Sequence, residues 1–293
     1  MEVMTLHISI AGRLGSGKST ICRLLEARHG FQVYSTGAIH REIALSHEVS
    51  TLEMNQKMAN DISFDHAIDA ATKKLSMEKA KEPIIFDSRM AWNFAVNSFK
   101  VFVTIDPHVA AMRVIEGRRA AEEVYANVEE AKAKLIERGR LENERFKDIY
   151  GVDNLDYSNY NLVIDSTHAT PEELADLIYA KYQAYCKADG KTHEILLSPM
   201  SLYPTETLTQ VDPISTSAPI PMVDFEGYHY IKSAHSAVLS AILNRALFVD
   251  ATRVDMEVQT LLAKLHAVGV SGLHGFEKLG AFRYKSYPGH YLG

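Results

Sequence analysis

The sequence has few of the residues that build disulfide-stabilised proteins and zinc proteins. It contains two cysteines and one tryptophan among 293 residues, and Cys22 and Cys186 lie far apart in the chain. This spacing predicts neither a disulfide framework nor a cysteine zinc site. The thirteen histidines also lack the spacing of zinc ligands. The scarcity of cysteine fits a protein of a reducing compartment.

Long apolar runs and an excess of positive charge are also missing. No segment approaches the roughly 18 uninterrupted apolar residues of a membrane-spanning helix, and the first residues, MEVMTLHISIAG, do not form a secretory signal. The formal net charge is -6, so bulk charge gives no reason to expect nucleic-acid binding. The composition, 46% hydrophobic and 23% charged, is typical of a soluble globular protein. We therefore expect a cytoplasmic protein whose partners include neither a membrane nor a nucleic acid.

Short apolar strands alternate with helical patterns over about the first 185 residues. The strand candidates are LHISIAG, FQVYS, PIIFDS, KVFVTID and YNLVIDS. Between and after them lie helical patterns, among them KSTICRLLEARHG, PHVAAMRVIEGRRA and TPEELADLIYAKYQAYCKA. Pro107 and Thr170 suit the first positions of the helices that they open. This alternation predicts an α/β fold with a five-stranded parallel sheet covered by helices on both faces.

The connection between the first strand and the first helix is rich in glycine. Its residues 12–19, GRLGSGKS, match the pattern G-x-x-x-x-G-K-[ST] in full, in the strand-to-helix context that the pattern requires. Glycines let backbone N–H groups curl around phosphate oxygens, and the helix start adds its own unpaired N–H groups. Lys18 can reach the outer phosphates, and the Ser19 hydroxyl can bind Mg²⁺. We predict that ATP is bound by Gly12, Gly15, Ser16, Gly17, Lys18, Ser19 and Thr20.

ATP binding alone does not distinguish a kinase from a switch or a motor, and a kinase also needs an acceptor site. The segment YSTGAIHRE follows the second strand, where Thr36 and Gly37 form a turn and Arg41 lies one helical turn later. The segment FDSRMAW places Asp87 at the carboxyl end of the third strand, where ligands bind in open α/β folds. There Asp87 could hold Mg²⁺ through water, and Arg89 follows it. The alternative interpretations are a capped surface helix and an Asx turn.

A group of arginines flanks a predicted break between two helices. Such runs are usually the solvated face of a helix, but this position also suits a lid that closes over phosphates. The group consists of Arg113, Arg118, Arg119, Arg138, Arg140 and Arg145.

Together these segments resemble the cytidylate-kinase-like family of P-loop nucleoside monophosphate kinases, from the first strand to about Tyr182. The more specific segments are STGAIHRE, FDSRMAW, ERFKDIYGVDNLDYSNYNLVIDST and TPEELADLI. The resemblance implies a P-loop kinase fold with a helical lid over residues 1–187. It also implies in-line transfer of the γ-phosphoryl group from ATP, with Mg²⁺, to a nucleoside monophosphate, with CMP or dCMP preferred.

The resemblance assigns roles to residues on both sides of this reaction. It implies that the acceptor is bound by Thr36, Gly37, Arg41 and Arg89. It implies that the catalytic cations are Lys18, Arg113, Arg118, Arg138 and Arg140, and that the metal is held by Ser19 and Asp87. Two departures leave the preferred base open, because Ser35 stands where bacterial members carry an acid and Ser88 where many members have glycine.

The composition changes after Lys187. The segment KADGKTHE is polar and reads as a linker, and five of the nine prolines lie between Pro199 and Pro221. We place a boundary near residue 190 and predict a smaller α+β domain over residues 194–293. Few contacts are expected to cross this boundary, so a fragment ending near Lys187 is expected to fold and keep its activity.

The order of elements in this second part resembles a degenerate ParB/sulfiredoxin-like domain. Pro204 and Thr205 match an early Pro-Thr element, and only His235 remains of a phosphate-binding turn, because Ser233 and Ser236 replace its glycine and arginine. The losses imply a role in partner contacts or in a homo-oligomer, for instance through the apolar segment AVLSAILNRALF. The alternatives are an ATP-binding regulator whose second domain binds a partner or nucleic acid, and a kinase for another small acceptor.

Overall fold

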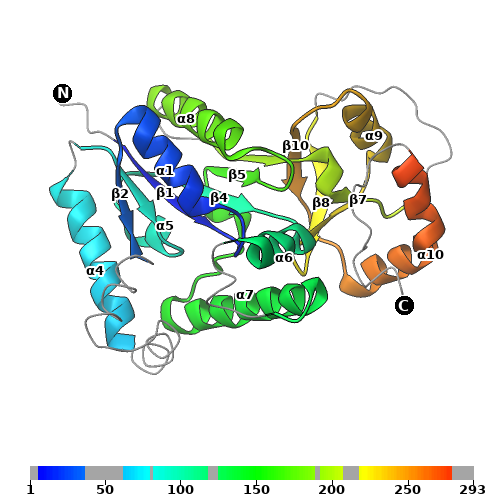
Figure 1. Ribbon diagram of the computed structural model, residues 1–293, viewed down its shortest axis with the longest axis horizontal. Coiled ribbons are helices and arrows are strands. Elements are labelled where there is room, and N and C mark those ends of the chain that lie inside the picture. The colour runs from blue at the N-terminus through cyan, green and yellow to red at the C-terminus, as the bar shows by residue number, and fades with distance from the viewer. Residues whose placement is uncertain are drawn as a thin grey trace.

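A ten-stranded sheet organises the molecule, and its first five strands are mutually parallel (Figure 1). The computed structural model describes residues 6–36, 62–79, 82–117, 125–188, 192–206 and 218–278. The parallel strands lie in the order β2-β3-β1-β4-β5. Their bounds are β1 His7–Gly12, β2 Gln32–Ser35, β3 Ile84–Asp87, β4 Ser98–Thr104 and β5 Leu162–Asp165. The predicted α/β architecture with a parallel sheet is therefore present.

Helices cover both faces of this parallel part (Figure 1). Helices α1 (Lys18–His29) and α8 (Pro171–Lys187) pack on one face, where Ile21 and Ile178 join the strand residue Ile10 in one hydrophobic cluster. The other helices of this part are α4 Ile62–Glu78, α5 Ala91–Phe94, α6 Pro107–Glu116 and α7 Val128–Tyr150, with a short 3-10 helix η2 at Tyr157–Asn159. Because both faces are covered, β1 is buried along its whole length.

The first turns of α8 and α6 confirm that Thr170 and Pro107 stand where these helices begin. Thr170 accepts a hydrogen bond from the Glu173 backbone N–H, and the Glu173 carboxylate accepts from the Thr170 N–H, which completes a capping box. At α6, Pro107 occupies the first turn, and the buried Asp106 carboxylate accepts the backbone N–H of His108 at 2.8 Å. Side-chain caps of this kind satisfy N–H groups that have no partner inside the helix.

The sheet continues beyond β5 with the residues that follow the predicted boundary. Strand β6 pairs in parallel with β5, and the order from there is β6-β10-β8-β9-β7. The bounds are β6 Glu194–Leu197, β7 Leu202–Tyr203, β8 Ile220–Phe225, β9 Tyr228–Ile231 and β10 Val249–Arg253, with η3 at Pro199–Ser201. Strands β8 and β9 form an antiparallel hairpin. Helices α9 His235–Leu243 and α10 Val258–Lys278 follow in this half.

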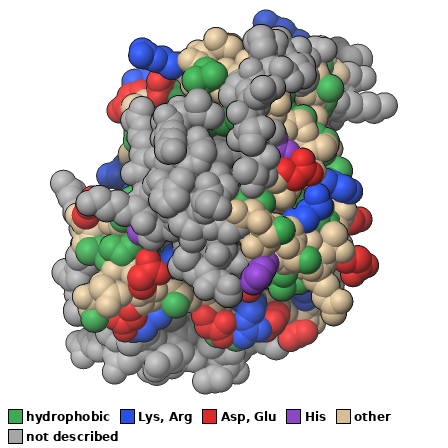
Figure 2. All heavy atoms as spheres, turned by 90° about the vertical axis from the view of Figure 1, so that its right-hand side faces the viewer, with side chains coloured by type: hydrophobic (Ala, Val, Ile, Leu, Met, Phe, Trp, Pro, Cys, Tyr) green, Lys and Arg blue, Asp and Glu red, His purple; other side chains and the backbone are tan. Residues whose placement is uncertain are grey.

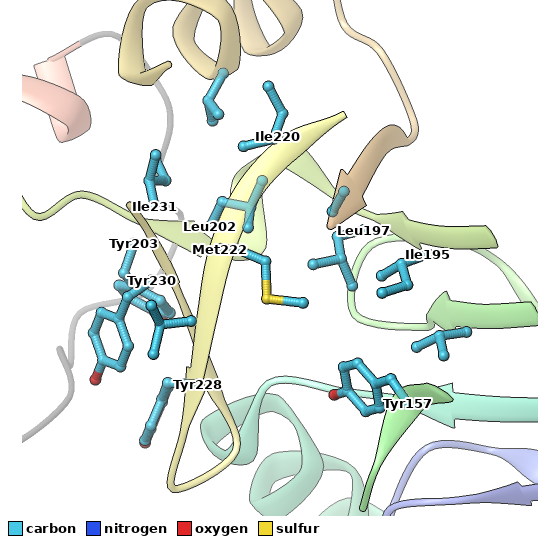
Figure 3. Packing of buried hydrophobic residues seen from close by; sticks show 14 of the residues in the cluster. Tyr157, Ile195, Leu197, Leu202, Tyr203, Ile220, Met222, Tyr228, Tyr230 and Ile231 are labelled. Atoms are coloured by element: carbon cyan, nitrogen blue, oxygen red, sulfur yellow. The ribbon is translucent and has the colours of Figure 1, made fainter. Parts of the chain in front are cut away.

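One hydrophobic core joins the two halves of the sheet (Figure 3). Phe102 of β4, Tyr157 of η2 and Val163 of β5 belong to the same buried cluster as Leu197 of β6 and Met222 of β8. The expectation that few contacts cross residue 190 is therefore wrong. The chain that follows the polar residues after Lys187 enters β6, which pairs with β5, and composition does not reveal that pairing.

The apolar segment AVLSAILNRALF lies mainly in this core rather than on the surface. In α9, Ala237, Val238, Leu239 and Ile242 are buried, whereas Leu243 is exposed. On the face shown in Figure 2, the coloured side chains of both charge signs are interspersed, unlike the one-sided basic surface of many nucleic-acid-binding proteins. No helix in the described ranges has the length and apolarity that crossing a membrane requires.

The shared core predicts that the first 187 residues do not form an independent unit. A fragment ending at Lys187 loses β6 to β10 and exposes part of the surface of residues such as Phe102 and Val163. Full exposure of such a side chain costs about 1.5–3 kcal/mol, and each kcal/mol lowers the melting temperature by about 2–4 °C in a chain of this size. We expect the fragment to melt at least about 10 °C below the full chain, or without a cooperative transition. Circular dichroism melts of the two proteins test this, and equal melting temperatures would contradict the shared core.

Candidate active site

The glycine-rich connection lies at the carboxyl edge of the parallel strands, between β1 and α1. Gly12 ends β1 with φ 150°, and a Cβ at this position would lie 2.2 Å from the backbone oxygen of Val103 in β4. Gly17 precedes α1 in the left-handed conformation, with φ 83°. Glycine is therefore required at Gly12 by the close approach of a neighbouring strand and is favoured at Gly17 by backbone conformation.

Lys18 and Ser16 give this loop the features of an anion site. The Lys18 ammonium donates to the backbone oxygens of Gly12 at 2.9 Å and of Arg13 at 3.1 Å. Ser16 is 1% exposed, and its hydroxyl has no hydrogen-bond partner within the described residues. A buried hydroxyl without a partner at a helix N-terminus matches the donor set that binds phosphate.

Ser19 and Asp87 meet beside the loop because β1 and β3 are parallel neighbours whose carboxyl ends coincide. The Ser19 hydroxyl donates to an Asp87 carboxylate oxygen at 2.8 Å, and the Ser35 hydroxyl lies 3.4 Å from the same oxygen. Asp87 is 9% exposed. Hydroxyl and carboxylate oxygens are ligands that suit Mg²⁺, which is usually bound through one or two protein groups together with substrate phosphates. The pair therefore fits the predicted metal.

A pocket of about 240 Å³ opens on the other side of the loop. Its wall includes Arg113, whose guanidinium donates to the backbone oxygens of Ser166 at 2.7 Å and Thr167 at 3.3 Å. The remaining lining is mostly small or apolar and consists of Ser16, Gly17, Thr20, Ile21, Ala169, Pro171 and Leu174. Arg113 therefore lies beside the loop, where it lines a pocket formed with the segment before α8, and its predicted role as a catalytic cation stays a prediction.

The other predicted cations lie on or near α7. Arg89 forms an ion pair with Glu142 of α7. Arg138 is exposed, and Arg140 is exposed and paired with Glu137 and Glu144 of its own helix. The structure thus brings Lys18, Ser19, Asp87 and Arg113 together but does not bring Arg140 to them. Thr36 directly follows β2, whereas Gly37, Arg41 and Arg118 lie outside the described residues.

Helices α4 and α7 are held together by a second set of polar contacts. Asp65 pairs with Arg145, and the Tyr150 hydroxyl donates to the Asp69 carboxylate. Burial raises the pKa of Asp69 to about 6, although the hydrogen bond from Tyr150 acts in the opposite direction. Asp69 therefore titrates near pH 6, in a contact between α4 and α7.

A largely buried ion pair, which no pattern in the sequence indicates, reaches the loop from the second half of the sheet. Arg13 stands at a variable position of the glycine-rich pattern, and its guanidinium lies 3.0 Å from the Asp224 carboxylate of β8. The Tyr157 hydroxyl donates to the same carboxylate at 2.8 Å. Burial alone would raise the pKa of Asp224, but the Arg13 charge and the hydrogen bonds from His229 and Tyr157 lower this pKa far below its usual range.

Comparisons with known proteins find relatives of the first part of the chain, which contains the glycine-rich loop and the parallel strands. A model of the cytidylate kinase-like family matches residues 7–168. The chain is 30% identical over 195 residues to the cytidylate kinase of Thermoplasma volcanium, covering 65% of this chain and 98% of that protein. It is 30% identical over 174 residues to the cytidylate kinase of Sulfolobus acidocaldarius, covering 59% of this chain and 92% of that protein. More than a third of this chain lies outside each match.

Two glycine substitutions test the geometry of the loop. Gly12→Ala places a methyl group against the Val103 backbone, which cannot move without disturbing β4. Gly17→Ala meets no atom within 4 Å, so its cost is that of a left-handed conformation, about 1–2 kcal/mol. We expect Gly12→Ala to lower the free energy of unfolding by clearly more than Gly17→Ala in urea titrations. Equal costs for the two variants would contradict the close approach of β4.

The contact between α4 and α7 predicts a pH dependence of stability. Because the pKa of Asp69 in the folded state is about 6, above its ordinary value of 3.8, the folded state holds the proton more tightly than the unfolded chain. The resulting stabilisation is complete below about pH 4 and is lost as the pH rises through 6. The Asp69→Asn side chain still accepts a hydrogen bond from Tyr150, but it does not ionise, so the variant does not lose stability as the pH rises. We expect the melting temperature of the variant minus that of the wild type to increase as the pH is raised from 5 to 7.5. A difference that stays constant over this range would contradict the raised pKa of Asp69.

Proposed function

Because the chain belongs to the cytidylate kinase-like family, we propose that it transfers the γ-phosphoryl group of ATP to a nucleoside monophosphate, with CMP or dCMP preferred. The observation that carries the proposal is the contact between Ser19 and Asp87 beside the glycine-rich loop. This contact places a pair of oxygen ligands next to a loop of the phosphate-binding pattern, at the carboxyl edge of a parallel sheet, where nucleotides bind in such folds. Kinases of this type need positioning and charge neutralisation rather than a covalent intermediate.

In this proposal, ATP is bound by the loop and the neighbouring pocket. Backbone N–H groups of Gly15 and Gly17 and the start of α1 bind the phosphates, together with the hydroxyls of Ser16 and Thr20. Lys18 leaves the backbone oxygens of Gly12 and Arg13 and binds the outer phosphates instead. The base of ATP enters the pocket lined by Ile21 and Leu174, where the flat Arg113 guanidinium can stack on it.

Ser19 and Asp87 would hold Mg²⁺, with Asp87 acting directly or through water. When bound, Mg²⁺ neutralises the charge that develops on the β- and γ-phosphate oxygens. The Ser19 hydroxyl donates a hydrogen bond to Asp87, so the two groups that would hold the metal are oriented toward the same position.

The acceptor would bind on the side of β2 and β3, through Thr36, Gly37, Arg41 and Arg89. Arg89 pairs with the Glu142 carboxylate, and the acceptor phosphate would compete with that carboxylate for the guanidinium. Arg118, Arg138 and Arg140 stay proposed lid cations. For Arg140 this role requires it to leave its pairs with Glu137 and Glu144.

Other features of the protein also remain proposals. They are a cytoplasmic location, a distinct role for residues 194–293 after the kinase part at 1–187, and homo-oligomer formation through the C-terminal part. The arrangement of α9, which places most of its apolar residues in its own core, leaves Leu243 and Leu247 as the exposed apolar residues of that segment.

The proposed function is tested by measuring ADP release from ATP with AMP, CMP, UMP, GMP and their deoxy forms. We expect turnover that depends on the acceptor and is highest with CMP or dCMP. Lys18→Ala should fold normally and lose on the order of 10²–10³-fold in kcat, because one preorganised group that stabilises transition-state charge is removed.

Three outcomes separate this function from its rivals. ADP release that no acceptor stimulates would exclude a nucleoside monophosphate kinase and favour a nucleotide-dependent regulator. Stimulation only by a different small phosphate acceptor would show that the kinase acts on another substrate. Near-normal turnover of Lys18→Ala would show that the glycine-rich loop is not the site of the reaction.

A further inference from the structure

The tip of the β8–β9 hairpin packs against the phosphate loop and the start of α6. A Cβ at Gly227 would lie 3.1 Å from a terminal nitrogen of Arg13 and 3.3 Å from a ring carbon of Pro107. Glu226 and Gly227 adopt left-handed conformations, with φ 50° and φ 87°, which is the backbone of a tight two-residue hairpin turn. The turn therefore brings Asp224 against a loop residue that is distant in the sequence.

The ion pair between Arg13 and Asp224 is nearly enclosed. The exposed fractions of the two side chains are 19% and 10%. Desolvation cancels most of the attraction between buried charges, so such a pair contributes little stability compared with apolar residues of the same shape. In this chain the pair connects the glycine-rich loop to β8, two segments that carry charges 211 residues apart in the sequence.

The position of Asp224 is itself fixed by two other elements. The Tyr157 hydroxyl of η2 donates to its carboxylate, and that hydroxyl lies 2.9 Å from Nε2 of His229 on β9. The Arg13 Nη2 group contacts both carboxylate oxygens, at 3.0 and 3.3 Å. The guanidinium thus meets a carboxylate that cannot easily rotate or withdraw.

Arg13 connects this network to the groups proposed to bind phosphate. Its backbone N–H donates to Val103 at 3.0 Å, and its backbone oxygen accepts from the Ser16 N–H at 3.3 Å. The same oxygen accepts from the Lys18 ammonium at 3.1 Å. A shift of Arg13 would therefore move both the turn that orients the loop and the resting position of Lys18.

We propose that Asp224 is a positioning residue for phosphate transfer, which acts through Arg13 to hold the phosphate loop in its binding geometry. The inference rests on the proposed function, and it means that the site is completed by a segment beyond the part of the chain that the family model matches. Asp224 does not touch ATP in this proposal, and its effect on the loop requires the Arg13 side chain.

The test is a double-mutant cycle with Asp224→Asn, Arg13→Met and the double variant in the full chain. For each protein, kcat and KM are measured with ATP and with the acceptor, and ADP affinity is measured by calorimetry. We expect Asp224→Asn to lose about 10- to 100-fold in kcat, the range expected when reacting groups are slightly misplaced. ADP affinity should fall in the same direction, while KM for the acceptor changes little.

The cycle separates positioning through Arg13 from a general structural effect. If Asp224 acts through Arg13, the double variant should be no worse than Arg13→Met alone. If the double variant instead loses kcat by the product of the two single-variant factors, the proposal is overturned. The matched control is Asp250→Asn, at an exposed position of β10 in the same half of the sheet, which should retain wild-type kcat and ADP affinity.

A milder variant covers the case in which Asp224→Asn does not fold. Tyr157→Phe removes only the hydroxyl that orients the carboxylate, and it should lower kcat and ADP affinity in the same direction by a smaller factor. Unchanged values in every folded variant would overturn the proposal. If the wild type shows no turnover with any acceptor, the proposed function fails, and the ADP affinities of the same proteins still decide whether Asp224 positions the loop.

Discussion

Parallel pairing of β1 with β3 and β4 is the constraint on which the whole site depends. It aligns Ile10 with Asp87 on one side and Gly12 with Val103 on the other, so three strand ends meet at one edge of the sheet. The backbone of β4 then lies so close to Gly12 that no side chain fits there. The chain must turn away from the sheet at that point, and the turn leads into the N-terminus of α1, where unpaired N–H groups can bind phosphate.

The sequence allowed the first half of this arrangement to be predicted because its signals are local. Alternating strands and helices, the glycine-rich pattern and caps such as Thr170 each depend on residues within a few positions of one another. Asp87 was found by its position at a strand end, which follows from topology. The contacts of Arg113 with Ser166 and Thr167 could not be predicted, because they depend on how α6 packs against the segment before α8.

The second half could not be predicted in the same way. A run of polar residues such as the one after Lys187 is compatible both with a linker between domains and with a short loop into the next strand. The pairing of β6 with β5 depends on an edge that the local sequence does not describe. Likewise, nothing near Arg13 in the sequence identifies a partner 211 residues away.

A phosphate loop faces a conflict between rigidity and availability. The backbone N–H groups that bind phosphate cannot also form the hydrogen bonds that would hold the loop in place, so the loop must be fixed by other contacts. The approach of β4 fixes its beginning at Gly12, and α1 fixes its end at Lys18. Between them, the Arg13 side chain forms a largely buried ion pair with Asp224 of β8. In the proposed function the pair holds a loop whose backbone groups bind phosphate, which would account for a charged pair that adds little stability compared with apolar residues of the same shape.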